Sequence, residues 1–276
     1  MAIIKVSCVQ MNITQCSKEE NIEKALLLAD KAIGSGARII VLPEVFSTGF
    51  CYKGLGSVAE TSPSQRVEDY PTIEKLLQFS KEHDCVLIGS VIEKRMEEPD
   101  LIRYHNLGFC IGSGYLAGTY RKTHLYGLEK KYFSRGENIA PIRLERNGIT
   151  VGLQICFDLR FPEISRKLAL SGADILVTVG GFAEPKAGQW KALAASRAIE
   201  NQIPHIACNR VGTAPFASYF GNSMIINAWG NVKAQAEGDE CFIIGEIDTD
   251  ETKRIRERFL SWMTGNWTCT KSRCRS

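Results

Sequence analysis

Buried strands and amphipathic helices alternate along almost the whole chain, and this alternation limits the fold more than any other feature of the sequence. The predicted strands are short apolar runs bounded by turn residues, and the predicted helices carry apolar residues at helical spacing. Strands are expected at 3–9, 38–42, 85–91, 105–111, 115–121, 149–155, 174–179, 205–208, 223–227, 232–236 and 242–247, and helices at 17–33, 71–83, 162–170, 188–201 and 249–259. A capping box of Ser17 and Glu20 is expected to open the first helix. The pattern predicts an α/β sheet covered by helices.

Two segments of the chain resemble each other. Residues 36–42 (GARIIVL) and 172–178 (GADILVT) share a glycine, an alanine and an apolar run, and each follows a strand and an amphipathic helix. The chain is therefore expected to contain two related β-α-β halves that stack sheet on sheet. A chance likeness between two ordinary α/β units would produce the same short match, and that alternative stays open.

Composition and charge exclude several classes of protein. A net charge of +3 is too small for a nucleic-acid-binding protein, and no apolar run approaches the roughly 20 residues of a membrane span. The first residues have no signal-peptide layout, so a cytoplasmic location is expected. Ten cysteines without a secretory signal then predict free thiols. None forms a Cys-x-x-Cys pair and no nucleotide-binding loop occurs, so neither a metal nor a cofactor is expected.

Cys156 stands at a predicted strand-to-helix corner. It ends the apolar run 149–155 and precedes a segment, 157–163 (FDLRFPE), that leads into a helix. Ligands collect at the carboxyl ends of strands in α/β sheets, and free backbone N–H groups at the start of a helix stabilise a thiolate or an oxyanion. Cys156 is therefore a candidate nucleophile. Its alternative is a small hydrophobic residue of the core.

A catalytic cysteine needs a base and a group that stabilises the oxyanion, and other strand ends carry suitable residues. Glu44 follows an apolar strand that stops at Pro43, and Lys122 follows the run 115–121. Glu129, seven residues after Lys122, is a candidate partner for it. Taken one at a time, each of these charged side chains could equally be a solvated surface group.

Taken together, the residues resemble the Glu-Lys-Cys triad of the nitrilase superfamily of carbon-nitrogen hydrolases. Glu44, Lys122 and Cys156 occur in the superfamily's order, and the segments around them, LPE at 42–44, RKTHL at 121–125 and GLQICFDLRFPE at 152–163, resemble its three catalytic motifs. Residues 189–193, 197–202 and 208–212 resemble the omega-amidase-like branch. The helical spacing of that region also fits a packed helix without catalytic groups.

The resemblance implies a four-layer α-β-β-α sandwich of two related sheet-and-helix halves. It implies one domain over residues 1–276, with a core at about 5–260 and a C-terminal extension at about 261–276, and assembly into a homodimer or higher homo-oligomer. Glu44 would be the base and Cys156 the nucleophile, with Lys122 at the oxyanion. Glu129 matches the auxiliary glutamate of the superfamily better than Glu137 does, because of its spacing from Gly136.

A small-molecule amide is the expected substrate, with hydrolysis of a terminal omega-amide to a carboxylate and ammonia as the main hypothesis. Amides of the deaminated-glutathione type and N-carbamoyl compounds remain alternatives, as does a non-catalytic binding or scaffold protein that keeps the fold. Phe157 and Phe182 are expected to wall the pocket or to pack in the core. Arg160 and Asp158 are expected to brace the cysteine corner, and Arg160 is also a candidate for binding a substrate carboxylate.

Overall fold

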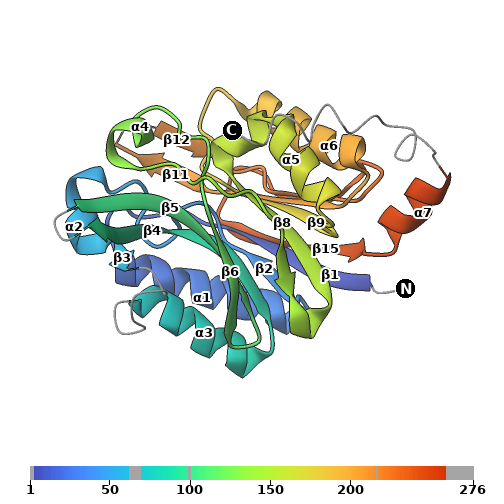
Figure 1. Cartoon of the computed structure of the whole chain (residues 1–276). Coiled ribbons are helices and arrows are strands. Elements are labelled where there is room, and N and C mark those ends of the chain that lie inside the picture. The colour runs from blue at the N-terminus through green and yellow to red at the C-terminus, as the bar shows by residue number, and fades with distance from the viewer. Residues whose placement is uncertain (1–2, 62–69, 99–100, 216, 259–276) are drawn as a thin grey trace.

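Two β-sheets stack face to face and carry helices on their outer faces (Figure 1). The computed structural model describes residues 3–61, 70–98, 101–215 and 217–258. In these residues the first sheet has the order β15-β1-β2-β4-β5-β6, with β3 paired to β4, and the second has the order β14-β13-β10-β9-β8-β7. The C-terminal extension at 261–276 lies outside the described residues.

The strands of the first sheet are β1 (Ile3–Gln10), β2 (Ile39–Val41), β3 (Glu60–Thr61), β4 (Val86–Glu98), β5 (Leu101–Gly112), β6 (Tyr115–Arg121) and β15 (Cys241–Asp248). Those of the second sheet are β7 (Ile142–Leu144), β8 (Ile149–Ile155), β9 (Ile175–Gly180), β10 (His205–Asn209), β13 (Met224–Ile226) and β14 (Val232–Gln235). A separate hairpin consists of β11 (Val211–Ala214) and β12 (Ala217–Phe220).

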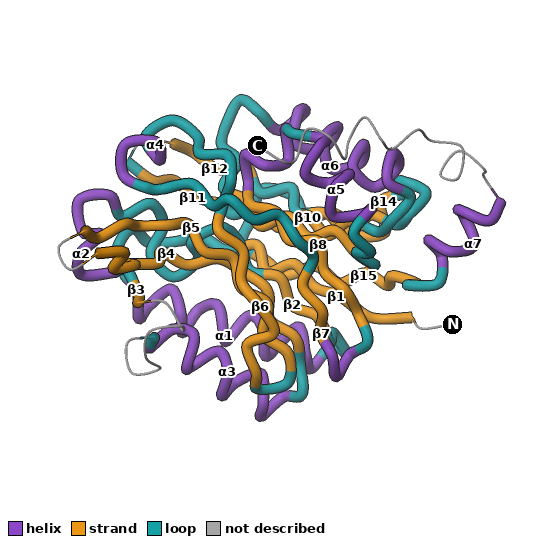
Figure 2. Tube along the Cα trace, in the orientation of Figure 1, coloured by secondary structure: helices purple, strands orange, loops and turns teal. Residues whose placement is uncertain are grey.

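Two long helices cover each sheet (Figure 2). Helices α1 (Lys18–Gly34) and α3 (Pro71–His83) lie on the first sheet, and α5 (Pro162–Leu170) and α6 (Ala187–Asn201) lie on the second. Shorter helices are α2 (Leu55–Val58), α4 (Glu129–Tyr132) and α7 (Glu251–Arg258). The layers therefore follow the predicted α-β-β-α order. No helix in the described part of the chain is both long and apolar enough to cross a membrane.

The internal likeness between 36–42 and 172–178 corresponds to two equivalent β-α-β units. In the first sheet β1, α1 and β2 form one unit, and in the second β8, α5 and β9 form the other. The two strands of each unit pair in parallel. A parallel pair needs a crossover connection, which the intervening helix supplies.

The main core lies between the two sheets. Inward-facing side chains of β1, β2 and β4, such as Val6, Val41 and Ile88, belong to the same buried cluster as Leu153 and Val177 of the second sheet. The two sheets approach closely at glycines: a Cβ at Gly108 would lie 2.8 Å from Leu153, which leaves no room for a side chain there. This close stacking brings the ends of β2 and β8 together.

One local expectation was wrong, and one hairpin was not anticipated. Ser17 is the N-cap of α1 but makes no side-chain capping bond. Instead, Asn21 accepts the Thr14 N–H at 2.9 Å, and the Thr14 hydroxyl donates to Glu20 at 3.0 Å. The Ser17 N–H, which Glu20 would accept in a capping box, donates instead to the Thr14 carbonyl at 3.2 Å. The hairpin β11–β12 was also not predicted, because its strands are short and only partly buried.

Candidate active site

Cys156 occupies the corner between β8 and a short 3₁₀ turn, Cys156–Arg160. Its φ of 46° lies in the left-handed region, which is costly for a residue with a side chain and is typical of a functional strand-to-helix turn. Asp158 holds this turn, because its Oδ2 accepts the Ile155 N–H at 3.0 Å and the Tyr120 hydroxyl at 2.8 Å. The cysteine is thereby held in the strained conformation.

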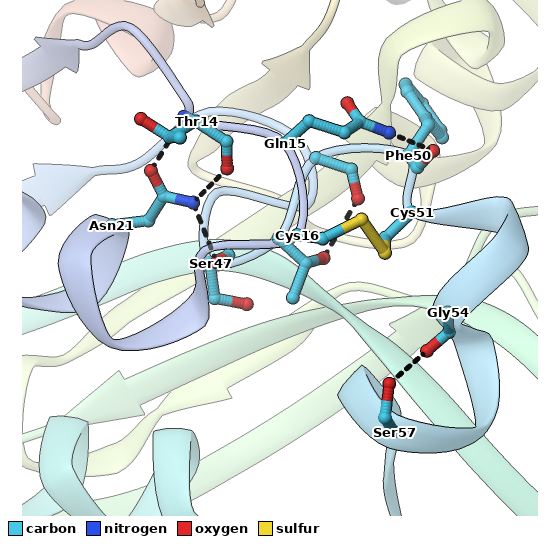
Figure 3. Close-up of a disulfide and its surroundings, with 11 residues drawn as sticks. Thr14, Gln15, Cys16, Asn21, Ser47, Phe50, Cys51, Gly54 and Ser57 are labelled. Carbon is cyan, nitrogen blue, oxygen red and sulfur yellow. Dashed lines mark hydrogen bonds between the residues drawn. A yellow bond between two sulfur atoms is a disulfide. The ribbon is translucent and has the colours of Figure 1, made fainter.

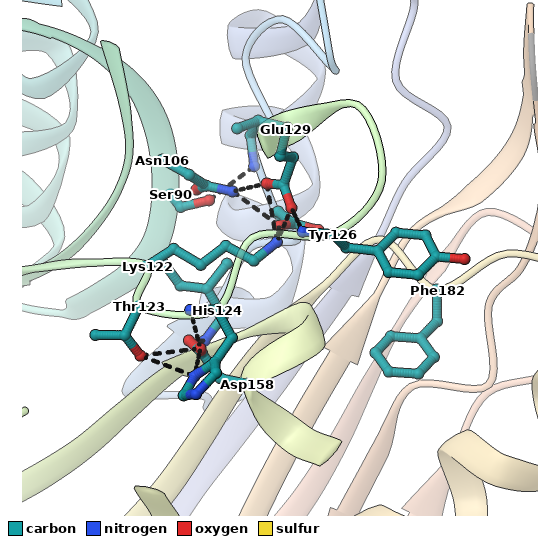
Figure 4. Close-up of polar contacts among 12 residues, drawn as sticks. Ser90, Asn106, Lys122, Thr123, His124, Tyr126, Glu129, Asp158 and Phe182 are labelled. Carbon is teal, nitrogen blue, oxygen red and sulfur yellow. Dashed lines mark hydrogen bonds and ion pairs between the residues drawn. The ribbon is translucent and has the colours of Figure 1, made fainter. Parts of the chain in front are cut away.

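Asp158 also ties the cysteine corner to the segment that carries Lys122. Its Oδ1 accepts the His124 N–H at 3.0 Å and the Thr123 hydroxyl at 3.2 Å (Figure 4). Arg197 of α6 adds a second brace through two N–H groups on the Leu159 carbonyl, at 3.0 and 2.8 Å. The bracing role expected of Asp158 is thus confirmed, and α6 packs as a structural helix beside the corner.

Glu44 follows β2 and is fully buried. Its N–H donates to the carbonyl of Gly180 at the end of β9 at 3.3 Å, so the backbone connects the two sheets at this point. The next residue, Val45, has a φ of 42° and donates its N–H to Ser90 Oγ at 2.8 Å. The strand therefore turns sharply directly after the carboxylate.

Lys122 extends from the end of β6 to a position between two carboxylates. Its Nζ lies 2.7 Å from Glu44 Oε1, and 2.7 and 2.9 Å from the two oxygens of Glu129. Asn106 of β5, which was not predicted, donates to Glu44 Oε1 at 2.8 Å. Glu44 and Lys122 thus lie with Glu129 in one buried network, and the charges of Glu44 and Lys122 act on the Cys156 thiol, whereas Glu137 is exposed.

The network controls the protonation of its members. Burial raises the pKa of Glu44, and the opposing charge of Lys122 offsets part of this effect. Burial on its own lowers the pKa of Lys122, but the charges of Glu129 and Glu44 outweigh it and raise that pKa well above its usual range. Lys122 is therefore held as an ammonium ion. A buried lysine with this charge requires its two carboxylate partners.

The Cys156 thiol is protonated at rest. Burial raises its pKa well above the usual range, the charge of Glu44 raises it further, and Lys122 opposes both. Within the described residues, no N–H or O–H group donates to Glu44 Oε2, and a Cβ at Gly181 would lie 2.9 Å from it. Burial raises the pKa of Glu44, and a hydrogen bond from the Cys156 thiol to the Glu44 carboxylate lowers it in part. Glu44 thus keeps one buried oxygen unused on the side of the site near Cys156, a suitable acceptor for a thiol proton.

These groups open onto a cavity of about 390 Å³, within the size range of small-molecule sites. Cys156, Lys122 and Glu129 line its inner part, and Phe157, Phe182 and Arg160 line its wall as the sequence suggested. Arg160 donates to Gln189 at 2.5 Å and also lies over the rings of Phe157 and Phe182. It therefore faces the pocket and is not confined to bracing the corner.

Further lining residues had no signal in the sequence. They are Gln15, Phe50, Tyr52, Tyr126, Lys186 and Tyr219, among others. Tyr52 stacks on Phe50 and Tyr132, with ring centroids 5.7 and 4.8 Å away. These side chains come from loops and from the hairpin, where neither period nor composition identifies a binding residue.

A disulfide links Cys16 and Cys51, and the expectation that all ten cysteines are free was therefore wrong (Figure 3). The two residues are 35 positions apart, and only the folding of the loops before α1 and after β2 brings them together. The neighbouring Gln15 donates to the Phe50 carbonyl at 2.5 Å. Because Gln15 and Phe50 both line the cavity, the bridge fixes one side of the pocket.

Metal-binding clusters are not found in the described ranges: no group of three or more His, Cys, Asp or Glu side chains there is arranged to hold an ion. The lysine and the two glutamates are already paired with one another. The chemistry that these residues support is that of an acid-base pair beside a thiol.

A four-layer α-β-β-α fold with cysteine, lysine and glutamate at converging strand ends defines the class of this protein. A profile of the carbon-nitrogen hydrolase family matches residues 5–257, and the chain belongs to that family, within the nitrilase superfamily. It is 32% identical to the 2-oxoglutaramate amidase of Bacillus subtilis over 91% of this chain and 93% of the relative. It is 29% identical to the human omega-amidase NIT2, over 94% and 93%. The crystal structure of Saccharomyces cerevisiae Nit3 superimposes with a TM-score of 0.86 at 23% identity, covering 96% of this chain and 97% of that one, which confirms the fold.

Proposed function

We propose that this protein is an omega-amidase, which hydrolyses a small terminal amide on a carboxylate-bearing substrate to a carboxylate and ammonia. The observation that carries the proposal is the contact of 2.7 Å between Glu44 and Lys122 in a pocket of small-molecule size that the Cys156 side chain lines as well. The relatives whose names state an omega-amide or 2-oxoglutaramate activity support the choice of substrate class.

Formation of the thioester begins with proton transfer from Cys156 to the unused oxygen of Glu44. The thiolate attacks the amide carbonyl, and the oxyanion is stabilised by the Lys122 ammonium and by the backbone N–H of Phe157. Glu44 then returns the proton to the nitrogen, and the C–N bond breaks to release ammonia. The acyl group remains on the sulfur as a thioester.

Hydrolysis of the thioester uses the same base. Glu44 takes a proton from water, the hydroxide adds to the thioester carbonyl, and the oxyanion again lies against Lys122. The C–S bond then breaks and Glu44 returns its proton to the sulfur, which restores the thiol, while the carboxylic acid product loses its proton to solvent and leaves as a carboxylate. Glu129 acts as a positioning residue, because both of its oxygens hold the Lys122 ammonium.

Arg160 supplies the recognition of a substrate carboxylate in this proposal. Its guanidinium lines the pocket and, among the described residues, forms no ion pair with a carboxylate. A planar guanidinium with unused donors suits a carboxylate well. The acid group at the far end of an omega-amide would thereby be held away from the thiol, which leaves the amide end at Cys156.

Ammonia release tests the proposal on a panel of omega-amides of dicarboxylic and oxo acids, peptide-like amides, N-carbamoyl compounds and nitriles. The highest kcat/KM is expected for the omega-amides. Cys156→Ala is expected to abolish release, and Cys241→Ala, which removes a half-buried thiol outside the pocket, should leave it unchanged. Preference for an N-carbamoyl compound, or release that survives in Cys156→Ala, would contradict the proposal.

A further inference from the structure

The wall of the pocket carries a second cation that the reaction described above does not use. Lys186 lines the cavity together with Arg160, and neither side chain forms an ion pair within the described part of the chain. Lys122, in the same cavity, is neutralised by Glu44 and Glu129. The inner part of the pocket, with one ammonium between two carboxylates, therefore has no excess of positive charge, whereas the wall does.

The fold holds Lys186 at a defined place. It is the N-cap residue of α6, and its carbonyl accepts the Trp190 N–H at 2.9 Å. Its ammonium lies 5.2 Å from the centroid of the Tyr126 ring and 3.5 Å from the Tyr126 hydroxyl. Tyr126 in turn donates its N–H to Glu129 Oε2 at 2.7 Å. Lys186 thus contacts Tyr126, in the segment that also carries the auxiliary glutamate, Glu129.

Arg160 and Lys186 occupy neighbouring parts of one aromatic wall. Arg160 lies over the Phe157 ring at 5.9 Å, and the Phe157 and Tyr126 rings are 5.0 Å apart. Figure 4 shows the Tyr126 side chain on the same side of the site as Phe182, the other ring beneath Arg160. Arg160 lies over the Phe157 and Phe182 rings and Lys186 lies over the Tyr126 ring, and each cation uses only some of its N–H donors. The wall therefore offers two separate positions for anionic groups.

The remaining acid of the wall does not neutralise these cations. Glu184 lines the cavity but is exposed, and no ion pair joins it to Lys186 or Arg160 in the described part of the chain. A substrate with one carboxylate would leave one cation of the wall unmatched. A substrate with two carboxylates would match both.

We propose that Lys186 is a specificity-determining residue that binds a second carboxylate of the substrate, so that the pocket prefers an amide with two acid groups over an amide with one. The inference rests on the proposed amidase function and refines its substrate class. In it, Arg160 binds one carboxylate and Lys186 the other, while the amide carbonyl lies at Cys156.

Two synthetic amides that differ by one carboxylate test this assignment. 4-Carbamoylbutanoyl-aspartate carries two carboxylates and 4-carbamoylbutanoyl-alanine carries one. Their Kd values are measured by calorimetry in the Cys156→Ala background, so that binding is read without turnover. With Lys186 present, the two-carboxylate compound is expected to bind about tenfold more tightly, the size of one charge-assisted contact.

Substitutions then locate the preference. Lys186→Met is expected to bring the ratio of the two Kd values close to one, and Lys186→Arg to restore most of it. Lys191→Met is the matched control, because Lys191 is an exposed cation on the same helix outside the pocket lining, and it should leave the ratio unchanged. Equal weakening of both compounds by Lys186→Met, or no preference with Lys186 present, overturns the assignment.

Ammonia release from the same compounds by the protein with Cys156 intact separates the two proposals. A Kd ratio that depends on Lys186 without any ammonia release would uphold the assignment of Lys186 and contradict the amidase function. Ammonia release with equal Kd values for the two compounds would support the amidase function and contradict the assignment of Lys186.

Discussion

Glu129→Gln tests whether the second carboxylate on Lys122 contributes to the reaction. The substitution keeps the size of the side chain and one hydrogen bond, and removes the negative charge that lies 2.7 Å from the Lys122 ammonium. At an effective dielectric constant of 20 and a charge separation of about 4 Å, that charge contributes about 4 kcal/mol of attraction. Without this attraction Lys122 is held less firmly at the oxyanion, and loss of a placed oxyanion donor, about 3 kcal/mol, corresponds to a decrease of kcat by about a hundredfold.

The pH profile gives a second readout that loss of packing would not produce. The charge of Glu129 raises the pKa values of Glu44, Lys122 and Cys156, so its removal lowers all three. Glu44 acts as a base only when ionised, so the acidic limb of the kcat/KM profile should move to lower pH in Glu129→Gln.

Ammonia release by the variants between pH 5 and pH 10 measures both effects. Glu137→Gln is the matched control, because Glu137 is an exposed glutamate eight positions further on, and it should match the parent protein. The reasoning is refuted if kcat of Glu129→Gln stays within threefold of the parent value, or if its acidic limb moves to higher pH.

Two further predictions concern contacts that the structure shows, and a third concerns the oligomeric state that the family resemblance implies. Asn106→Ala removes a donor to the ionised form of Glu44, so the acidic limb should move to higher pH and kcat should fall about tenfold; an unchanged profile would count against this contact. The double substitution Cys16→Ser/Cys51→Ser opens a loop of 35 residues and should lower the free energy of unfolding by about 2–4 kcal/mol in urea titrations. Reducing agent should destabilise the parent by a similar amount and leave the double variant unaffected, whereas equal sensitivity of both would argue against the bridge. Light scattering coupled to gel filtration should give the mass of a homodimer or a larger homo-oligomer, and a mass of 30.7 kDa would refute that expectation.

Much of the fold could be predicted because its signals are local. The strands and the long helices follow from apolar runs and helical spacing, and the parallel pairing within each half follows from the connecting helix. Cys156 could be identified as a candidate because a strand-to-helix corner is visible in a dozen consecutive residues. Glu44 and Lys122 became candidates through their order and motifs.

Other parts of the site had no such signal. Asn106 lies inside a long strand, where an isolated polar residue does not reveal which group it contacts. Lys186 and Gln15 lie in loops, and their places in the pocket depend on how those loops fold over the sheets. The capping box of Ser17 failed because the Thr14 hydroxyl donates to Glu20 and the Thr14 carbonyl accepts the Ser17 N–H.

The sequence alone determined the alternation of elements, the two related halves, and the residues able to act as nucleophile, base and oxyanion donor. Tertiary structure decided which carboxylates hold Lys122, which cysteines form a bridge and which cations remain unpaired in the pocket. The physical reason is the distance along the chain over which each signal acts. Hydrophobic periodicity and turn residues report only interactions between residues a few positions apart. Glu44 and Lys122 are 78 positions apart in the sequence. Their side chains meet only when the chain has folded and both charged groups are buried.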